Sequence, residues 1–113
     1  MISNQILQST IDGLKGITRT DFCVCDAEGV TLAGTSPSMG SYGEDVISFV
    51  NSPAESQVVG GCQFFKVMDE NQLEYVLLVR GGGDDTFMIG KMVVFQIQNL
   101  LVAYKERFDK ENF

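Results

Sequence analysis

The chain has 113 residues, 44% of them hydrophobic and 20% charged, and a formal net charge of -7. This length and composition fit a single folded domain over residues 1–113 and exclude a disordered chain. The acidic balance excludes nucleic-acid binding by this segment, because contacts with phosphates need a basic surface.

The N-terminal part of the chain predicts a helix followed by a β-hairpin. Ser3 is a suitable N-cap, and apolar residues recur at helical spacing from there to Thr18. Two runs rich in β-forming residues lie at 21–26 and 30–35, and the turn sequence DAEG joins them. Their tight connection predicts an antiparallel pair.

Proline, glycine and asparagine residues divide the rest of the chain into a loop, a short helix, two or three strands and a long final helix. Asp84 or Asp85 is expected to cap that helix, since acidic side chains favour a helix N-terminus. In chain order, the predicted elements are a loop at 36–45, a helix at 46–50, a minor strand at 57–59, strands at 62–68 and 73–80, a glycine loop at 81–83 and the final helix.

This order predicts an α+β fold built on a central antiparallel sheet of four to five strands. The strands at 62–68 and 73–80 are apolar at both odd and even positions, so both faces of the sheet should be covered. We expect the short helix on one face and the N- and C-terminal helices together on the other.

The cysteines and the missing histidine limit the chemistry of the chain. Cys23 and Cys25 form a C-x-C pair and Cys62 is distant in sequence, so small buried side chains are favoured over a zinc site, which prefers four N or S ligands. Without histidine, the chain lacks the usual Ser-His and Cys-His nucleophile systems. We therefore expect no metal, no cofactor and no catalytic residue, and a protein that is not an enzyme.

Neither end of the chain predicts membrane insertion. The N-terminal residues lack the basic region and continuous apolar core of a signal peptide. The apolar final helix is interrupted by Lys91, Gln96, Gln98 and Asn99, so we expect no membrane span and a cytoplasmic protein.

Arg80 is the candidate for ligand binding. It ends a predicted strand beside Gly81, where backbone can approach a ligand, and its guanidinium can hold a carboxylate through two hydrogen bonds. The alternative is a solvated arginine or an ion pair with Glu74, Asp84 or Asp85. The hydroxyl groups predicted to join Arg80 come from the 36–45 loop: Ser36, Ser41 and Tyr42, with Ser38 as a further candidate.

The final helix carries two apolar stripes. The first stripe consists of Val93, Ile97, Leu100 and Tyr104, at spacings of four, three and four residues, which is typical of a helix–helix contact. The second stripe consists of Met88, Met92, Phe95 and Val102, and is broken by Asn99. One stripe can pack on the sheet and the other needs a partner. We expect a homodimer through the first stripe together with Leu7 and Ile11 of the first helix; the alternative is a single core helix.

Four segments resemble the N-terminal sensor region of bacterial transcriptional regulators of the carbohydrate diacid regulator and PucR groups, which is PAS-like. They are ISNQILQSTIDGLKGI, FCVCDAEGVTLAGT, FFKVMDENQLEYVLLV and IGKMVVFQIQNLLVAYKERFDKENF. The resemblance implies a domain that binds a small metabolite and passes the signal through its last helix to a helix-turn-helix DNA-binding part beyond this segment.

A second family has the same element order. Roadblock-type and other profilin-like scaffolding modules dimerise without a ligand. A filled core between the sheet and the short helix would favour the scaffold, and a cavity into which Arg80 points would favour the sensor.

Overall fold

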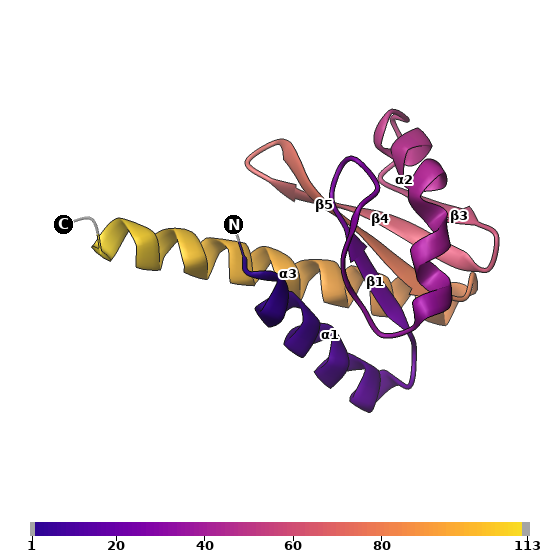
Figure 1. The fold of residues 1–113 in the computed structure, drawn as a ribbon, viewed down its shortest axis with the longest axis horizontal. Coiled ribbons are helices and arrows are strands. Elements are labelled where there is room, and N and C mark those ends of the chain that lie inside the picture. The colour runs from indigo at the N-terminus through magenta and orange to yellow at the C-terminus, as the bar shows by residue number, and fades with distance from the viewer. Residues whose placement is uncertain (1, 112–113) are drawn as a thin grey trace.

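A five-stranded antiparallel sheet with the strand order β2-β1-β5-β4-β3 forms the centre of the fold (Figure 1). The computed structural model describes residues 2–111, with side chains up to residue 106. The helical elements are α1 Asn4–Thr18, the 3₁₀ helix η1 Pro37–Tyr42, α2 Gly43–Val50 and α3 Asp84–Glu111. The strands are β1 Phe22–Cys25, β2 Thr31–Gly34, β3 Ser56–Val59, β4 Cys62–Asp69 and β5 Gln72–Arg80.

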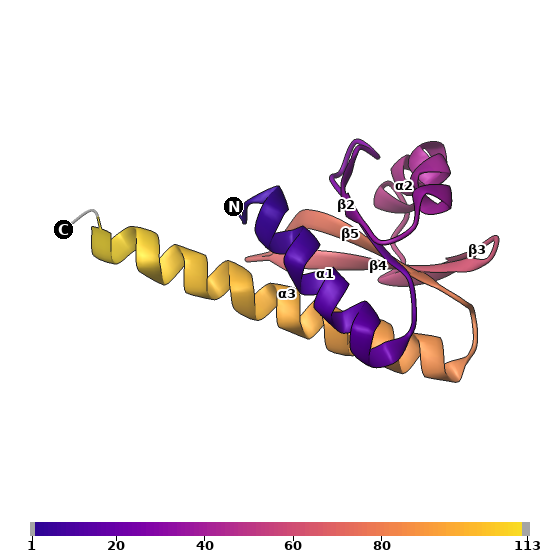
Figure 2. The same ribbon diagram turned by 60° about the horizontal axis from the view of Figure 1, so that its bottom comes forward.

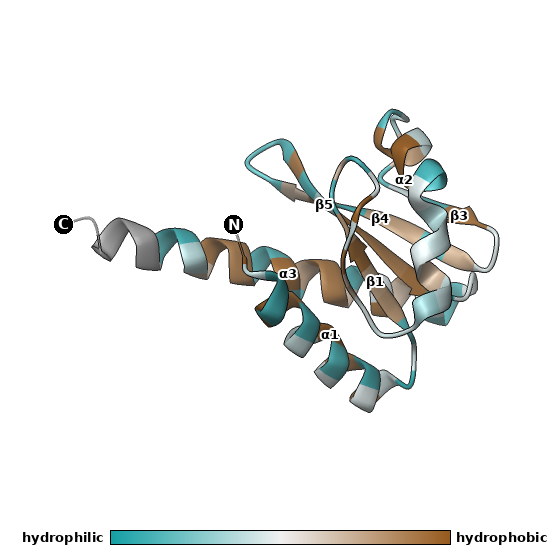
Figure 3. Ribbon diagram, in the orientation of Figure 1, coloured by the Kyte–Doolittle hydropathy of each residue, from teal (hydrophilic) through white to brown (hydrophobic). Residues whose placement is uncertain are grey.

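Helices cover both faces of this sheet, as the sequence predicts. Figure 2 shows α1 and α3 on one side and α2 on the other. Neighbouring residues of β4 illustrate the alternation, because Phe64 packs into the α2-side core and Phe65 into the α1–α3-side core. The brown ribbon in Figure 3 places the most hydrophobic residues on the strands and along α3. The predicted α+β architecture is confirmed.

Local side-chain contacts explain where the first elements begin and turn. The Ser3 hydroxyl accepts a hydrogen bond from the Ile6 amide at 3.2 Å, so it caps α1 as predicted. In the β1–β2 turn, one Asp26 carboxylate oxygen accepts hydrogen bonds from the amides of Glu28 and Val30 at 2.9 and 3.0 Å. Gly29 supplies the positive φ of 82° that the turn requires.

The segment predicted as a loop at 36–45 is more ordered than expected. Pro37 occupies the start of η1, where its fixed φ favours a helical turn, and α2 begins at Gly43, three residues before the predicted start. Glu44 and Asp45 lie in the first turn of α2, where their charge complements the helix dipole. Pro37 and the glycines of this stretch therefore mark a short 3₁₀ helix.

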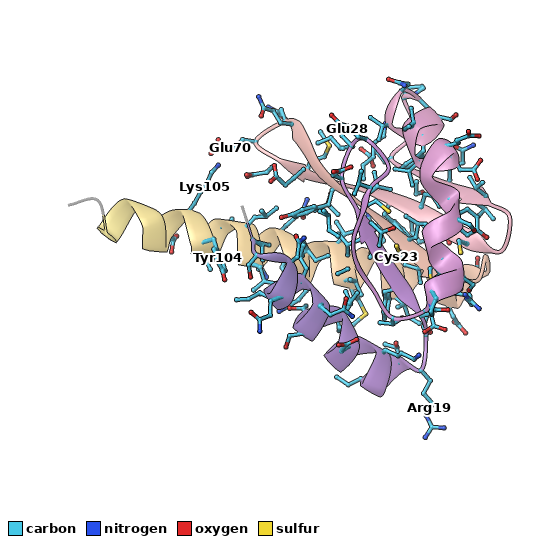
Figure 4. All side chains as sticks on the ribbon, viewed as in Figure 1. Arg19, Cys23, Glu28, Glu70, Tyr104 and Lys105 are labelled. Atoms are coloured by element: carbon cyan, nitrogen blue, oxygen red, sulfur yellow. The ribbon has the colours of Figure 1, made fainter. Side chains whose placement is uncertain are left out.

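The long helix α3 packs on the sheet and continues past it (Figure 1). By length and composition, Asp84–Glu106 is a stretch long and apolar enough to cross a membrane, but Val93, Ile97 and Leu101 are buried in the protein core. Lys105 extends from α3 toward the β4–β5 turn (Figure 4), where it pairs with Asp69 at 3.4 Å and Glu70 at 3.0 Å. The helix is thus the core helix of a folded globule.

The two stripes of α3 have exchanged the roles predicted for them. Val93 and Ile97 of the first stripe are 1% and 0% exposed, and Leu100 and Tyr104 pack against the same core. Leu7 and Ile11 of α1 are fully buried as well. These six residues therefore belong to the protomer's own core, and the predicted dimer interface is corrected. The second stripe is the exposed one. Its apolar residues are Met88, Met92, Phe95 and Val102.

Candidate functional site

Arg80 lies at the end of β5, on the face of the sheet that carries η1 and α2. The strand alternation puts it on the same side as Val76 and Leu78, which pack in the α2-side core. Its Nη2 atom donates hydrogen bonds to two hydroxyl groups of the η1 segment, to Ser36 Oγ at 3.2 Å and to Ser38 Oγ at 2.5 Å. The guanidinium is thereby oriented by neutral acceptors.

Arg80 forms no ion pair within the described side chains, although its charge helps to lower the pKa of the Asp21 carboxyl. The ion pairs among residues 2–106 involve Lys15 and Lys105, and neither Glu74 nor Asp84 nor Asp85 pairs with Arg80. Within that part of the chain, the guanidinium donates only from Nη2, which leaves its other N–H groups for a ligand. Arg80 is exposed to solvent, so an incoming anion can reach it.

A shallow pocket of about 270 Å³ opens beside Arg80. We call the residues that line it the Arg80 site: Ser38, Tyr42, Gly61, Cys62 and Arg80. The Tyr42 ring lies over Gly60, whose φ is 59°, and packs edge-on against Phe64 with ring centroids 5.7 Å apart. The neighbouring Cys62 thiol raises the pKa of the Tyr42 hydroxyl, which therefore stays protonated and able to donate near neutral pH.

Two glycines connect this pocket to the start of α3. The Gly81 amide donates a hydrogen bond to the Gly61 carbonyl at 2.8 Å, so the end of β5 is tied to the start of β4. Gly81 has a φ of 120°, and a Cβ there would overlap the Thr86 hydroxyl in the first turn of α3. The backbone that carries Arg80 is thus packed directly against the beginning of the long helix.

Four of the five residues predicted for ligand binding gather at this place. Arg80 and Tyr42 line the pocket, Ser36 bonds to Arg80, and Gly81 adjoins it. Ser41 does not line the pocket, because its hydroxyl donates to the Ser38 carbonyl at 3.1 Å within η1. Ser38 was the lesser candidate in sequence, yet it makes the shorter bond to Arg80.

Gly61 and Cys62 were missing from the predicted site. The signal for them was the tight turn between β4 and β5, which brings the start of β4 to the end of β5. A β-bulge between Val67 and Met68 then sets the final pairing of Cys62 with Arg80.

The space between the sheet and α2 is filled with apolar side chains. Met39, Phe49 and Phe64 are at most 1% exposed there. Cys23 and Cys25 pack in the same core with their sulfurs 3.8 Å apart, and the hydrogen bond between the two thiols together with burial raises the pKa of the Cys25 thiol. The Arg80 site is therefore a pocket at the rim of this core, and Arg80 does not point into its interior.

Further hollows flank the sheet, including one of about 400 Å³ between the β4–β5 turn and α3 and two larger ones. One of about 450 Å³ adjoins the Arg80 site and is lined partly by the hydroxyl-bearing Thr31, Thr35 and Ser36. The larger one, of about 570 Å³, lies on the opposite side, along α3, and its walls include Phe65, Phe87 and Phe95. None of the residues predicted for ligand binding lines the larger hollow.

No protein-family model matches this chain, and no curated protein matches it. The function is therefore inferred from the geometry of the Arg80 site, from α3 and from the resemblance carried by the sequence segments.

Proposed function

We propose that the chain is the ligand-sensing and dimerisation domain of a cytoplasmic transcriptional regulator. It binds a small acidic metabolite at the Arg80 site and passes the signal through α3 to a helix-turn-helix DNA-binding part. The resemblance to sensor regions of the carbohydrate diacid regulator and PucR groups supports this function class. The net charge of -7 fits a segment that senses and leaves nucleic acid to another part of the protein.

The observation that carries the proposal is the oriented guanidinium of Arg80, which forms no ion pair within the described side chains. Two serine hydroxyls hold one of its nitrogens, and Arg80 lines a pocket of about 270 Å³. A carboxylate in this pocket would form a bidentate charge-assisted pair, which is stronger than a hydrogen bond between neutral groups. The nearby hydroxyls of Ser38 and Tyr42 suit a ligand that also carries hydroxyl groups.

The signal leaves the site through the glycine loop. Only residues 81–83 separate Arg80 from the first residue of α3. A ligand that displaces Arg80 also displaces the adjoining Gly81, which packs against Thr86. The ligand therefore shifts the start of α3. It changes the output only by binding one arrangement of α3 more tightly than another.

A thermal-shift screen with a matched pair of variants tests the proposal. The panel contains sugar diacids, purine-breakdown acids and the corresponding neutral polyols. Arg80→Gln should abolish the stabilisation by acids, whereas Arg19→Gln, which removes the same charge at the C-cap of α1, should preserve it. Equal stabilisation of both variants by an acid would exclude binding through Arg80.

One observation favours the second candidate, a roadblock-type or profilin-like scaffold that dimerises without a ligand. The core beneath α2 is filled, with Met39, Val46 and Phe49 all at most 1% exposed, so the fold has no internal ligand cavity at that place. If the chain dimerises but no acid in the panel stabilises it, the scaffold function replaces the sensor.

A further inference from the structure

The second stripe of α3 is an apolar surface that the protomer does not cover. Met88, Met92 and Phe95 are 65%, 67% and 65% exposed, and Val102 is 51% exposed. With the exposed Asn99 included, the spacings are four, three, four and three residues. This is the heptad spacing of a two-stranded coiled coil, with Met92 and Asn99 at a positions and Met88, Phe95 and Val102 at d positions.

The second stripe faces directly away from the sheet. At about 100° per residue, the buried Val93, Ile97 and Leu101 fall on the opposite side of the helix from it. In heptad terms they occupy positions b, f and c, which face outward in a coiled coil. Figure 2 shows α3 along the lower side of the molecule, with the sheet above it. Phe95 and Val102 also line hollows whose walls include Met68 of β4, so a helix laid along the second stripe would run beside that edge of the sheet.

We infer that the second stripe pairs with the second stripe of another copy, in a parallel two-stranded coiled coil. The parallel register places Asn99 opposite Asn99 of the other copy, where the two amides can hydrogen-bond to each other. An antiparallel pairing of the same length would bury Asn99 against Phe95 without a polar partner.

The flanking charges agree with the parallel register, because Lys91 then faces the neutral Gln96 of the other copy. The antiparallel register would place Lys91 against Lys105.

The area of the stripe suits a reversible dimer. Its four apolar side chains offer on the order of 400 Å² per copy, about half of what each partner buries in a standard interface. The stems of flanking residues such as Lys91 and Gln98 extend the contact. Methionine at two positions packs adaptably, which permits more than one helix register. A dimer of this kind can respond to a change at the start of α3.

Sedimentation velocity over a range of protein concentrations tests the surface. The wild-type chain should form dimers, and Phe95→Lys should weaken self-association at least tenfold. Ile17→Lys is the matched control, because Ile17 on α1 is 82% exposed and should not affect association. Circular dichroism confirms that each variant is folded. A wild-type monomer at the highest concentration, or a Phe95→Lys dimer of unchanged affinity, would overturn the inference.

Cysteine cross-linking tests the direction of the helices, since Cys23, Cys25 and Cys62 are buried and should not react. In the parallel dimer, Val102→Cys should form a disulfide with itself under mild oxidation. In the antiparallel dimer, the two copies of residue 102 would lie about 15 Å apart along the helix axis. Mixed Met92→Cys and Val102→Cys chains would then cross-link only to each other, a result that rules out the parallel arrangement.

This inference rests on the dimerisation in the proposed function but not on its ligand site. Arg80→Gln should remain a dimer and lose its response to acids. Phe95→Lys should become monomeric and still bind an acid at the Arg80 site. The two proposals therefore fail in separate measurements.

Discussion

Gly90 lies in the middle of α3, where the helix approaches the ring of Phe65 on β4. A Cβ at this position would overlap the edge of that ring, and even the third-nearest ring atom, Cδ2, would lie only 2.9 Å away. Ordinary contacts of this kind are at least 3.4 Å, so the ring or the helix must move. Gly90 is buried and Phe65 is 2% exposed. Gly90→Ala should therefore overpack the core.

Two opposing effects set the size of the change. Overpacking a well-packed core costs about 1–3 kcal/mol, whereas replacing a helical glycine with alanine contributes about 1 kcal/mol of stability. Because a Cβ at Gly90 would overlap the ring atoms Cε2 and Cζ of Phe65, the overpacking cost should fall at the upper end of its range, and we expect Gly90→Ala to lower the free energy of unfolding by about 2 kcal/mol. Gly13→Ala in α1 is the matched control, because a Cβ there meets nothing within 4 Å. It should raise stability by about 1 kcal/mol.

Urea unfolding followed by circular dichroism, at one fixed protein concentration, measures both variants. The combination of Gly90→Ala with Phe65→Leu should lose less stability than the two single changes together, because the smaller side chain relieves the overlap. If Gly90→Ala is as stable as the wild type or more stable, the packing of α3 on Phe65 is incorrect.

Two further predictions concern stability. Hydrogen bonds from Lys15, 2.7 Å away, and from Thr35 hold the pKa of the Asp21 carboxyl below its ordinary value. The ionised Asp21 therefore stabilises the fold above about pH 4, and this stabilisation is lost as the pH falls through the lowered pKa. Asp21→Asn should therefore be less stable than the wild type near neutral pH, by less than about 1 kcal/mol because the pair is partly exposed. In urea titrations this difference should vanish at low pH. A difference that grows toward low pH would contradict the assignment. Gly81→Ala should lower the free energy of unfolding by about 1–3 kcal/mol, because Gly81 has a positive φ. Gly82→Ala should be close to neutral in the same assay, because the nearest contact of its Cβ would be an ordinary 3.4 Å. Equal effects of the two substitutions would refute the strain at Gly81.

The layered fold could be predicted because several independent patterns agree on it. The Ser3 cap, the DAEG turn and the apolar residues at both parities of β4 and β5 each depend on local chemistry alone. Each of these was confirmed. The 3₁₀ helix η1 was missed, because Pro37 followed by serines and glycines is equally typical of an irregular loop.

Spacing alone could not decide which stripe of α3 faces the sheet. Both stripes are apolar and both fit a helical period, so the first stripe was assigned to the dimer. Gly90 was the informative residue, since a glycine inside a helix often marks a close approach to a neighbouring element. It lies on the side of Val93 and Ile97, which is the side that packs on the sheet.

The candidate site was predictable to the extent that strand alternation and register are. The turn at Glu70 and Asn71, both with positive φ, pairs β4 with β5, but the bulge at Val67 and Met68, which shifts the register by one residue and sets Cys62 opposite Arg80, could not be read from it. Because β5 is apolar at both parities, its sequence did not decide that Arg80 faces α2. The choice between Ser38 and Ser41 depended on the turn of η1, because Ser41 bonds back to the Ser38 carbonyl. Sequence pattern carried no information on that turn.

The most direct test of the proposed function is an NMR titration of the ¹⁵N-labelled chain with sugar diacids and purine-breakdown acids. At least one acid should produce saturable shifts of the backbone amides of Ser36, residues 38–42, Gly61 and Gly81, and Arg80→Gln should abolish them. If no acid in the panel shifts these amides, or if the same shifts persist in Arg80→Gln, the chain does not sense an acidic metabolite at Arg80.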